Sequence, residues 1–278
     1  MNNLVYQIYY SLETKDQNDK GFIQLENLTN ERPDWREYWP IRNFLLNTEL
    51  DEDTRYGFLS PKFGVKTKLT SRIVADFVKN DESDIVFFSP FFDQTAFHFN
   101  VFEQLEAAHV GGLAVAQDCL KIIRPDVDIY SLIMDSRNTV YCNYFIANKK
   151  FWITWFSYCE TVFNIAESND SDLARKLNTN VEHDGGNAPM KVFIIERMVS
   201  FILAVNKNLN VKFYNPMELP LCNAAMEEFK NELCVLDALK ISFLASPLSN
   251  YAQEFEIRRR KLFNNLIKSI STECHDVK

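Results

Sequence analysis

The sequence predicts an α/β fold, in which helices flank a sheet and a helical region follows. Residues 56–59 and 85–88 are predicted to be buried strands, because each is a short apolar run that stops at Ser-Pro. A helical pattern over residues 69–79 lies between them, and this β-α-β order predicts that the two strands pair in parallel. Every pattern after this part is helical, so we expect an α/β domain over residues 1–215 and a helical extension, residues 216–278, packed on it.

The other elements follow from the spacing of apolar residues and from capping residues. Residues 4–10 favour a first strand, and a long polar connection follows it. Thr70 or Ser71 can cap the helix at residues 69–79, and Asn148 can cap a later helix. Residues 190–205 are too continuously apolar for a surface helix, which predicts a buried one. The remaining expected elements are helices at 35–46, 97–109, 113–123 and 151–168, strands at 139–146 and 211–214, and a flexible connection at 169–189.

Composition limits the class of protein and of partner. The chain has 278 residues, a net charge of −8 and a pI near 5.2, which argues against binding nucleic acid by neutralising its phosphates. No apolar run approaches the roughly 20 residues that span a bilayer, and the start lacks the pattern of a secretory signal. We therefore expect a cytoplasmic protein, and any association with the membrane would be peripheral, at its inner face. The six cysteines are widely spaced without a C-x-x-C pair, which disfavours a zinc site and a disulfide framework: Cys119, Cys142, Cys159, Cys222, Cys234 and Cys274.

Several motifs that would identify a reaction are missing. The sequence contains no GxSxG, no P-loop and no GxGxxG, so hydrolases of that kind, P-loop ATPases and nicotinamide enzymes are disfavoured. His98, His109 and His183 share no spacing typical of metal ligands, and we assign no metal to them. Residues 51–53 and 126–128 have the D-x-D form that can bind a divalent ion, but this form is common by chance.

Polar residues directly after the two buried strands are the first candidates for a site, because ligands of α/β sheets bind outside the carboxyl ends of the strands. Ser60, Lys62 and Lys66 follow the first strand, and the two lysines can either neutralise a diphosphate or be solvated. Asp93 and Gln94 follow the second strand, and Asp93 is either a helix cap alone or also a catalytic or substrate-binding acid.

Further candidates are polar residues within apolar surroundings. Asn100 and Glu103 lie one turn apart on a helix, at a cleft edge or in solvent. Asp135 and Asn138 precede the strand at 139–146, and Asn143 interrupts it, where a buried amide needs partners.

Glu196 and Arg197 lie within the apolar helix at residues 190–205. Two charges in so apolar a run are costly unless they pair or face a cavity. They are therefore either a structural ion pair or part of a site.

Five blocks of the sequence resemble bacterial GT-A-type glycosyltransferases of capsule and O-antigen (lipopolysaccharide) clusters. The blocks lie in order between Tyr38 and Met198: YWPIRNFLL, RYGFLSPKFGVKT, DIVFFSPFFDQ, MDSRNTVYCNYFIANKKFW and MKVFIIERM. The resemblance implies a GT-A-like, Rossmann-related mixed sheet and makes residues 1–215 a nucleotide-sugar-binding and catalytic domain. Residues 56–63 would then present the donor diphosphate. Ser60-Pro61-Lys62 stands where such enzymes have D-x-D, so a divalent cofactor, Mg or Mn, is left open.

The reaction that the resemblance implies moves a sugar from a nucleotide-diphosphate donor to a saccharide or lipid-linked acceptor. Lys62, Lys66 and Arg197 would stabilise the leaving diphosphate, because preorganised cations stabilise developing negative charge. Asp93 is the first choice for the base that takes the acceptor proton, ahead of Asp135. Glu196 is also counted among the catalytic candidates. The remaining candidates for binding the donor are Ser60, Gln94, Asn100, Asn138 and Asn143, and Trp39 and Phe92 are candidates for stacking on sugar or base.

Two other functions remain open at this point. One is a non-catalytic, GT-A-like interaction protein of a polysaccharide synthesis complex, which the missing D-x-D favours. The other is a glycoside hydrolase that uses Asp93 and Glu103, which requires the two carboxyls to face each other across a cleft. A single pocket that gathers Lys62, Asp93, Asn143 and Glu196 would favour the transferase. The basic run 258–261 leaves open contact with a membrane surface, a partner or only water.

Overall fold

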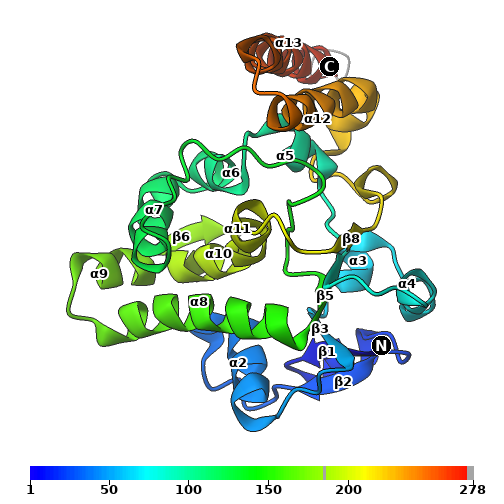
Figure 1. Cartoon of the computed structure of the whole chain (residues 1–278), viewed down its shortest axis with the longest axis vertical. Coiled ribbons are helices and arrows are strands. Elements are labelled where there is room, and N and C mark those ends of the chain that lie inside the picture. The colour runs from blue at the N-terminus through cyan, green and yellow to red at the C-terminus, as the bar shows by residue number, and fades with distance from the viewer. Residues whose placement is uncertain (184–185, 274–278) are drawn as a thin grey trace.

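The computed structural model describes residues 1–183 and 186–273 and has a six-stranded mixed sheet at its centre (Figure 1). The strand order is β2-β1-β3-β5-β4-β8. β5 is antiparallel to both of its neighbours, and the other neighbours pair in parallel. The predicted α/β class is therefore confirmed. The strands are β1 (Asn2–Tyr9), β2 (Ile23–Glu26), β3 (Thr54–Leu59), β4 (Ile85–Phe87), β5 (Phe145–Asn148) and β8 (Val211–Phe213).

The predicted direct pairing of the two buried strands is wrong, because β5 lies between β3 and β4. Gly57 lets β5 approach β3: a Cβ at this position would lie 2.8 Å from Cγ1 of Ile146. β5 also begins later than the predicted strand at 139–146, because Cys142 and Asn143 have positive φ angles of 62° and 54° and are not extended. β3 and β4 still run in the same direction, so their carboxyl ends lie at the same edge of the sheet.

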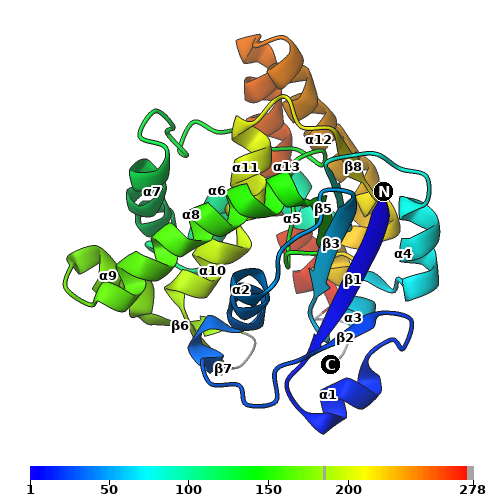
Figure 2. The same ribbon diagram turned by 60° about the horizontal axis from the view of Figure 1, so that its bottom comes forward.

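Helices cover both faces of the sheet, and the two faces differ in size. The larger core joins strand residues such as Phe58 and Phe145 to the helices on one face. The smaller core joins Leu59 and Val86 to the two helices on the other face, as Figures 1 and 2 show. On the larger side lie α2 (Tyr38–Asn47), α6 (Val101–Ala108), α7 (Gly112–Ile123), α8 (Lys149–Ser168), α9 (Asp172–Asn178), α10 (Met190–Glu196) and α11 (Met198–Val205); on the smaller side lie α3 (Phe63–Thr67) and α4 (Ser71–Val78).

The predicted caps are present. The side chain of Thr70 accepts a hydrogen bond from the backbone N–H of Ile73, and Asn148 accepts one from Phe151. The polar connection after β1 contains elements that the sequence did not predict, α1 (Leu12–Gln17) and β2. The helix expected at 35–46 is a 3-10 turn, η1 (Pro33–Trp35), followed by α2.

Part of the connection expected to be flexible is regular structure. It forms α9 and a hairpin of β6 (Asn180–His183) and β7 (Gly186–Pro189), and residues 184 and 185 lie outside the described residues. The single helix predicted at 190–205 is two helices, α10 and α11, which meet at Arg197. Because the helix breaks here, the side chains of Glu196 and Arg197 point in different directions.

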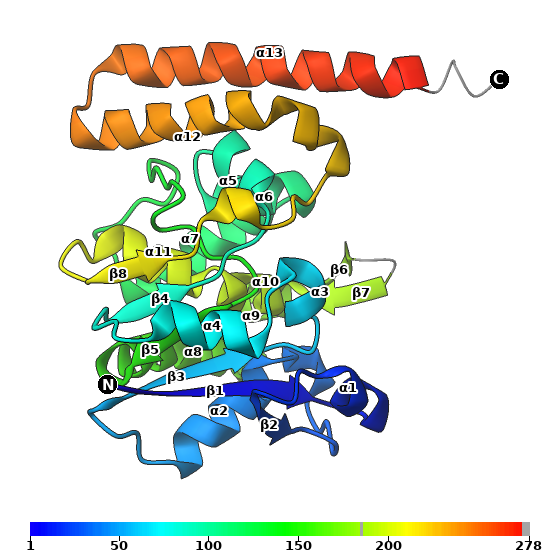
Figure 3. The same cartoon turned by 90° about the vertical axis from the view of Figure 1, so that its right-hand side faces the viewer.

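The end of the chain is helical, as expected. α12 (Lys230–Ala245) packs on α5 (Phe92–Phe97), and α13 (Ser249–Glu273) packs on α12, which Figure 3 shows as a helical hairpin above the sheet. Short 3-10 turns, η2 (Pro216–Glu218) and η3 (Ala224–Phe229), connect β8 to α12. Phe92, Leu236 and Phe255 belong to the apolar cluster that joins these helices. Within residues 1–183 and 186–273, no helix is both long enough and apolar enough to cross a bilayer.

The buried side chain of Arg55 connects β3 to its neighbour β1 and to the end of α4. Arg55 at the start of β3 is fully buried and donates to Oδ1 of Asn3 at 2.9 Å and to the carbonyl oxygens of Ser83 and Val78 at 3.1 and 3.2 Å. It also pairs with Asp81. This one side chain therefore ties β1 and the end of α4 to β3.

We expect Arg55→Met to lower the free energy of unfolding by about 3–5 kcal/mol, because it leaves buried acceptors without their charged donor. Urea denaturation measures the change. Arg72→Met is the matched control, since Arg72 is 91% exposed and its ion pair with Asp76 spans 4.0 Å, so it should change stability by less than about 0.5 kcal/mol. Equal midpoints for the two variants would contradict the role given to Arg55.

Candidate functional site

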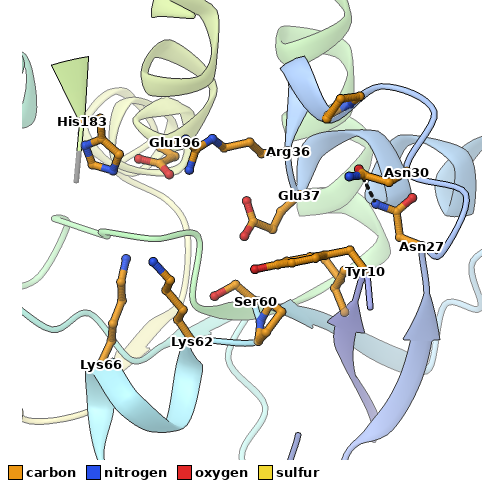
Figure 4. Close-up of a pocket in the computed structure, with 13 residues that line it drawn as sticks. Tyr10, Asn27, Asn30, Arg36, Glu37, Ser60, Lys62, Lys66, His183 and Glu196 are labelled. Carbon is orange, nitrogen blue, oxygen red and sulfur yellow. Dashed lines mark hydrogen bonds between the residues drawn. The ribbon is translucent and has the colours of Figure 1, made fainter. Parts of the chain in front are cut away.

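A cavity of about 320 Å³ opens at the carboxyl ends of β1 and β3 (Figure 4). This is the position at which α/β sheets place their ligands. Its walls carry charges of both signs beside polar and aromatic groups. The lining residues are Ile8, Tyr10, Asn27, Asn30, Pro33, Arg36, Glu37, Ser60, Pro61, Lys62, Lys66, His183 and Glu196.

The turn from β3 to α3 supplies one wall of the cavity. Phe63 is fully buried and packs edge-on against Tyr144, with 5.0 Å between the ring centroids, which fixes the start of α3. Ser60 shares a hydrogen bond of 2.8 Å with the hydroxyl of Tyr144. Figure 4 shows Lys62 and Lys66 extending from this turn toward the part of the cavity that carries Glu196. The three candidates predicted just after the first buried strand, Ser60, Lys62 and Lys66, thus all line this cavity.

Arg36 and Glu37 form the opposite wall. Arg36 has φ 48° and ψ −131°, a backbone conformation that a residue with a side chain rarely adopts. Such strain costs of order 1–3 kcal/mol and gathers at functional sites, where the surrounding structure enforces it. In Figure 4 the guanidinium of Arg36 reaches across the cavity toward Glu196.

A charged network holds this strained turn in place. Arg32 donates to Glu167 at 2.6 and 2.9 Å, and Trp35 donates to the same carboxylate at 3.0 Å. Asp34 accepts from Arg32 at 2.8 Å and from the buried ammonium of Lys191 at 2.6 Å. η1 is therefore fastened to α8 and α10, and the position of Arg36 follows from these contacts.

Glu196 and Arg197 face different parts of the molecule. Glu196 is half-buried and lines the cavity at the end of α10. Arg197 is buried on the other side, where it donates to the carbonyl oxygens of Val101 at 2.8 Å and Phe193 at 2.9 Å and to Gln104. Arg197 therefore does not line the cavity, because the helix break directs it into the core, and the guanidinium in the lining is that of Arg36.

Burial and the neighbouring charges shift the pKa values of Glu37 and Lys66 in the cavity. Burial raises the pKa of the Glu37 carboxyl, and the negative charge of Glu196 raises it further. Burial lowers the pKa of Lys66, but the neighbouring Cys142 and Glu196 outweigh this effect, so that the pKa is raised. Lys66 thus remains charged around neutral pH, while Glu37 holds its proton to a higher pH than an exposed glutamate does.

Asp93 and Gln94 do not line the cavity. Asp93 is fully buried in the first turn of α5, whose N-cap residue is Phe91, and it accepts hydrogen bonds from the backbone N–H groups of Cys222 and Asn223 at 2.8 and 3.0 Å. Gln94 donates to Asp93 at 3.3 Å. Asp93 therefore anchors the chain that leads into α12, and it is not placed to act as a base in this cavity.

Three more residues that the sequence suggested for the site do not line the cavity and stabilise the fold instead. Asn100 caps α6 and donates to the carbonyl oxygen of Leu132 at 2.7 Å. Asp135 is fully buried and accepts two hydrogen bonds from the guanidinium of Arg137, at 2.9 and 2.7 Å. Asn138 accepts from the backbone N–H of Asp135 at 2.9 Å. These contacts explain how Asn100, Asp135 and Asn138 are accommodated in apolar surroundings.

The aromatic rings chosen for stacking are also engaged elsewhere. Phe92 is buried in the cluster under α12, and Trp39 stacks on Phe163 with 6.4 Å between the ring centroids. Tyr10 lines the cavity in Figure 4, and 43% of its surface is exposed. The sequence missed Tyr10 because it ends a run that was assigned wholly to the first strand.

Neither D-x-D segment reaches the cavity. Asp51 accepts from the backbone N–H of Asp53 and from the hydroxyl of Thr54, both at 2.9 Å, at the opposite end of β3. Asp126 pairs with Arg124 at 2.7 Å. In the part of the chain that the structure describes, no group of three or more His, Cys, Asp or Glu side chains is arranged to hold a metal ion.

Comparisons with models of protein families, with curated proteins and with solved structures find no match to this chain. The site is therefore interpreted from its own residues.

We expect Asp34→Asn to lower the melting temperature at pH 7 and to lose this effect in acid. Burial raises the pKa of Asp34, but its bonds to Arg32 and Lys191 dominate and hold the pKa at about 2. A carboxyl whose pKa is lower in the folded protein than in the unfolded chain stabilises the fold at pH values above its unfolded pKa of 3.8. This stabilisation is lost as the pH falls through the folded pKa.

The measurement is the difference in melting temperature between wild type and Asp34→Asn at several pH values. It should be largest from pH 5 to 7 and shrink between about pH 4 and 2. Asp16→Asn, at an exposed aspartate on α1, is the control and should show little difference at any pH. A difference for Asp34→Asn that stays constant down to pH 2 would refute the assignment.

Proposed function

We propose that the protein is a GT-A-like glycosyltransferase that uses a nucleotide-diphosphate sugar, as in the synthesis of surface polysaccharides. The observation that supports this proposal most is the gathering of Arg36, Lys62 and Lys66 with Glu37 and Glu196 around one cavity at the carboxyl ends of parallel strands. A mixed sheet with one antiparallel strand near its middle is compatible with that class of fold.

The three cations suit a diphosphate. Arg36 presents a planar guanidinium that can bind two phosphate oxygens at once, and Lys62 and Lys66 act as point charges. Cleavage of the bond between the sugar and the diphosphate builds negative charge on the leaving oxygen, which fixed cations stabilise. These side chains can carry out the task that a divalent ion performs in enzymes with a D-x-D motif.

Glu196 is the base in this proposal. The acceptor hydroxyl oxygen forms a bond to the anomeric carbon, the bond from that carbon to the diphosphate oxygen breaks, and its electron pair leaves with the diphosphate. The hydroxyl proton passes to the carboxylate of Glu196, toward which Arg36, Lys62 and Lys66 extend in Figure 4. Asp93 and Asp135 are replaced in this role because both are buried and engaged elsewhere.

A panel of nucleotide sugars and nucleoside diphosphates tests the proposal by calorimetry and by release of nucleotide. We expect at least one nucleoside diphosphate to bind, and Lys66→Met to weaken its binding about tenfold or more, because a charge-assisted hydrogen bond is lost. Lys68→Met is the matched control, since Lys68 ends the same helix but is exposed and does not line the cavity. No binding across the panel would refute the proposal.

The role of the base is tested by comparing Glu196→Gln with Asp93→Asn. We expect Glu196→Gln to lower kcat about a hundredfold or more while the donor still binds, because a general base contributes at least that much. Asp93→Asn should instead lower the melting temperature, since it weakens the two bonds to the chain before α12. Lost turnover in Asp93→Asn with normal turnover in Glu196→Gln would return the role to Asp93. Binding without turnover in the wild type would favour the non-catalytic interaction protein.

A further inference from the structure

One buried polar atom beside the cavity has no hydrogen-bond partner. Among the described residues, three buried side-chain atoms lack a partner: Asn18 Oδ1, Asn143 Oδ1 and Trp155 Nε1. The amide nitrogen of Asn18 already makes three bonds, and Trp155 lies fully inside the core. Asn143 is different because it is one of the residues that line a hollow. An unsatisfied buried carbonyl is costly, so a partner that arrives with a ligand is the simplest explanation.

The hollow is a narrow recess that shares its walls with the main cavity. It measures about 40 Å³, and Arg36, Glu37, Ser60, Lys66 and Glu196 line both spaces. A single water needs roughly 10–15 Å³ on this scale, so the recess can admit about three hydroxyl-sized groups at most. The rest of a ligand would remain in the main cavity, which is eight times larger by volume (320 against 40 Å³).

The backbone at Asn143 has an unfavourable conformation. Cys142 and Asn143 are consecutive and both have positive φ angles, 62° and 54°. Each such angle costs energy for a residue with a side chain, although Asn tolerates it better than most. Ser89 accounts for part of the restraint, because its hydroxyl accepts from the backbone N–H of Tyr141 at 3.0 Å. Strain together with an unpaired oxygen is the combination expected of a residue kept for binding.

We propose that this recess receives a hydroxyl-bearing edge of the transferred sugar, and that Oδ1 of Asn143 accepts a hydrogen bond from that hydroxyl. The inference rests on the proposed function and specifies which part of the donor the recess recognises. A phosphate group does not fit this position, because its oxygens only accept hydrogen bonds and would face the carbonyl of Asn143 and two glutamates. A sugar hydroxyl both donates and accepts, so it can donate to Asn143 or Glu37 and accept from Lys66.

Calorimetry separates recognition of the sugar from recognition of the diphosphate. The probes are UDP and GDP, and UDP-glucose, UDP-N-acetylglucosamine, UDP-galactose and GDP-mannose. For the nucleotide sugar that wild type binds best, we expect Asn143→Ala and Asn143→Gly to weaken binding about tenfold or more, because a site built for a hydroxyl loses its acceptor. Binding of the parent nucleoside diphosphate should change less than about twofold, because the cations that hold it are intact.

The stability of the unliganded protein gives a second measurement that does not depend on the choice of sugar. Asn143→Gly should raise the melting temperature, because it removes both the unsatisfied carbonyl and the strained Cβ. Asn80→Gly is the matched control, since Asn80 has a φ angle of 57° but is exposed to water, so it should gain only the effect of the backbone. A larger rise for Asn143→Gly supports the inference, and an equal or smaller rise counts against it.

The outcomes distinguish the two proposals. Only the recess assignment is overturned if wild type binds the nucleotide sugar no more tightly than the nucleoside diphosphate. The same holds if the Asn143 variants weaken the binding of nucleotide sugar and of nucleoside diphosphate equally, or weaken neither, as expected if water alone fills the recess. If wild type binds none of the six nucleotides, the proposed function fails, and the assignment of the recess fails with it.

Discussion

β5 runs antiparallel between β3 and β4, and this reversal brings the start of β5 to the edge where β3 and β4 end. Cys142 and Asn143 therefore meet the carboxyl ends of the parallel strands, instead of lying at the far side of the sheet. Gly57 permits the arrangement, because any side chain there would collide with Ile146. The cavity and its recess depend on this close approach of two strands.

The second requirement of the site is a balance of charge in a half-enclosed space. The negative charge of Glu196 raises the pKa of Glu37, and the positive charges of Arg36 and Lys66 lower it. In the proposed function the cations would bind the diphosphate and Glu196 would accept the proton, so two separate sets of groups would carry the two tasks. The strain of Arg36 is sustained from outside the site, by the bonds of Arg32, Asp34 and Trp35 to α8 and α10.

The sequence predicted the local features of this protein well. The ends of β1, β3 and β4, the caps Thr70 and Asn148 and the helical carboxyl end follow from composition and spacing within a few residues. Ser60, Lys62 and Lys66 were found because an apolar run that stops at polar residues is visible in a short window, and their place in the cavity lining agrees with that expectation. Their part in binding a donor remains a prediction.

The features that the sequence did not predict depend on contacts between distant segments. Arg36 and Glu37 look like the beginning of an amphipathic helix, and contacts with distant segments, such as the bond from Arg32 to Glu167, 135 positions along the chain, fix them in the cavity wall. Asp93 follows a strand as a catalytic acid would, but its partners are backbone N–H groups 129 and 130 positions away. The opposite directions of Glu196 and Arg197 arise from a helix break that the apolar pattern hides.

The central claim is that one cavity at this sheet edge binds a nucleotide-diphosphate sugar through fixed cations. The most direct measurement is a crystal structure of the protein with the nucleotide sugar that binds most tightly. The account predicts diphosphate oxygens within hydrogen-bonding distance of Arg36 and Lys66 and a sugar hydroxyl at Oδ1 of Asn143. A nucleotide bound elsewhere on the molecule, or a sugar that points away from Asn143 and Glu196, would contradict it.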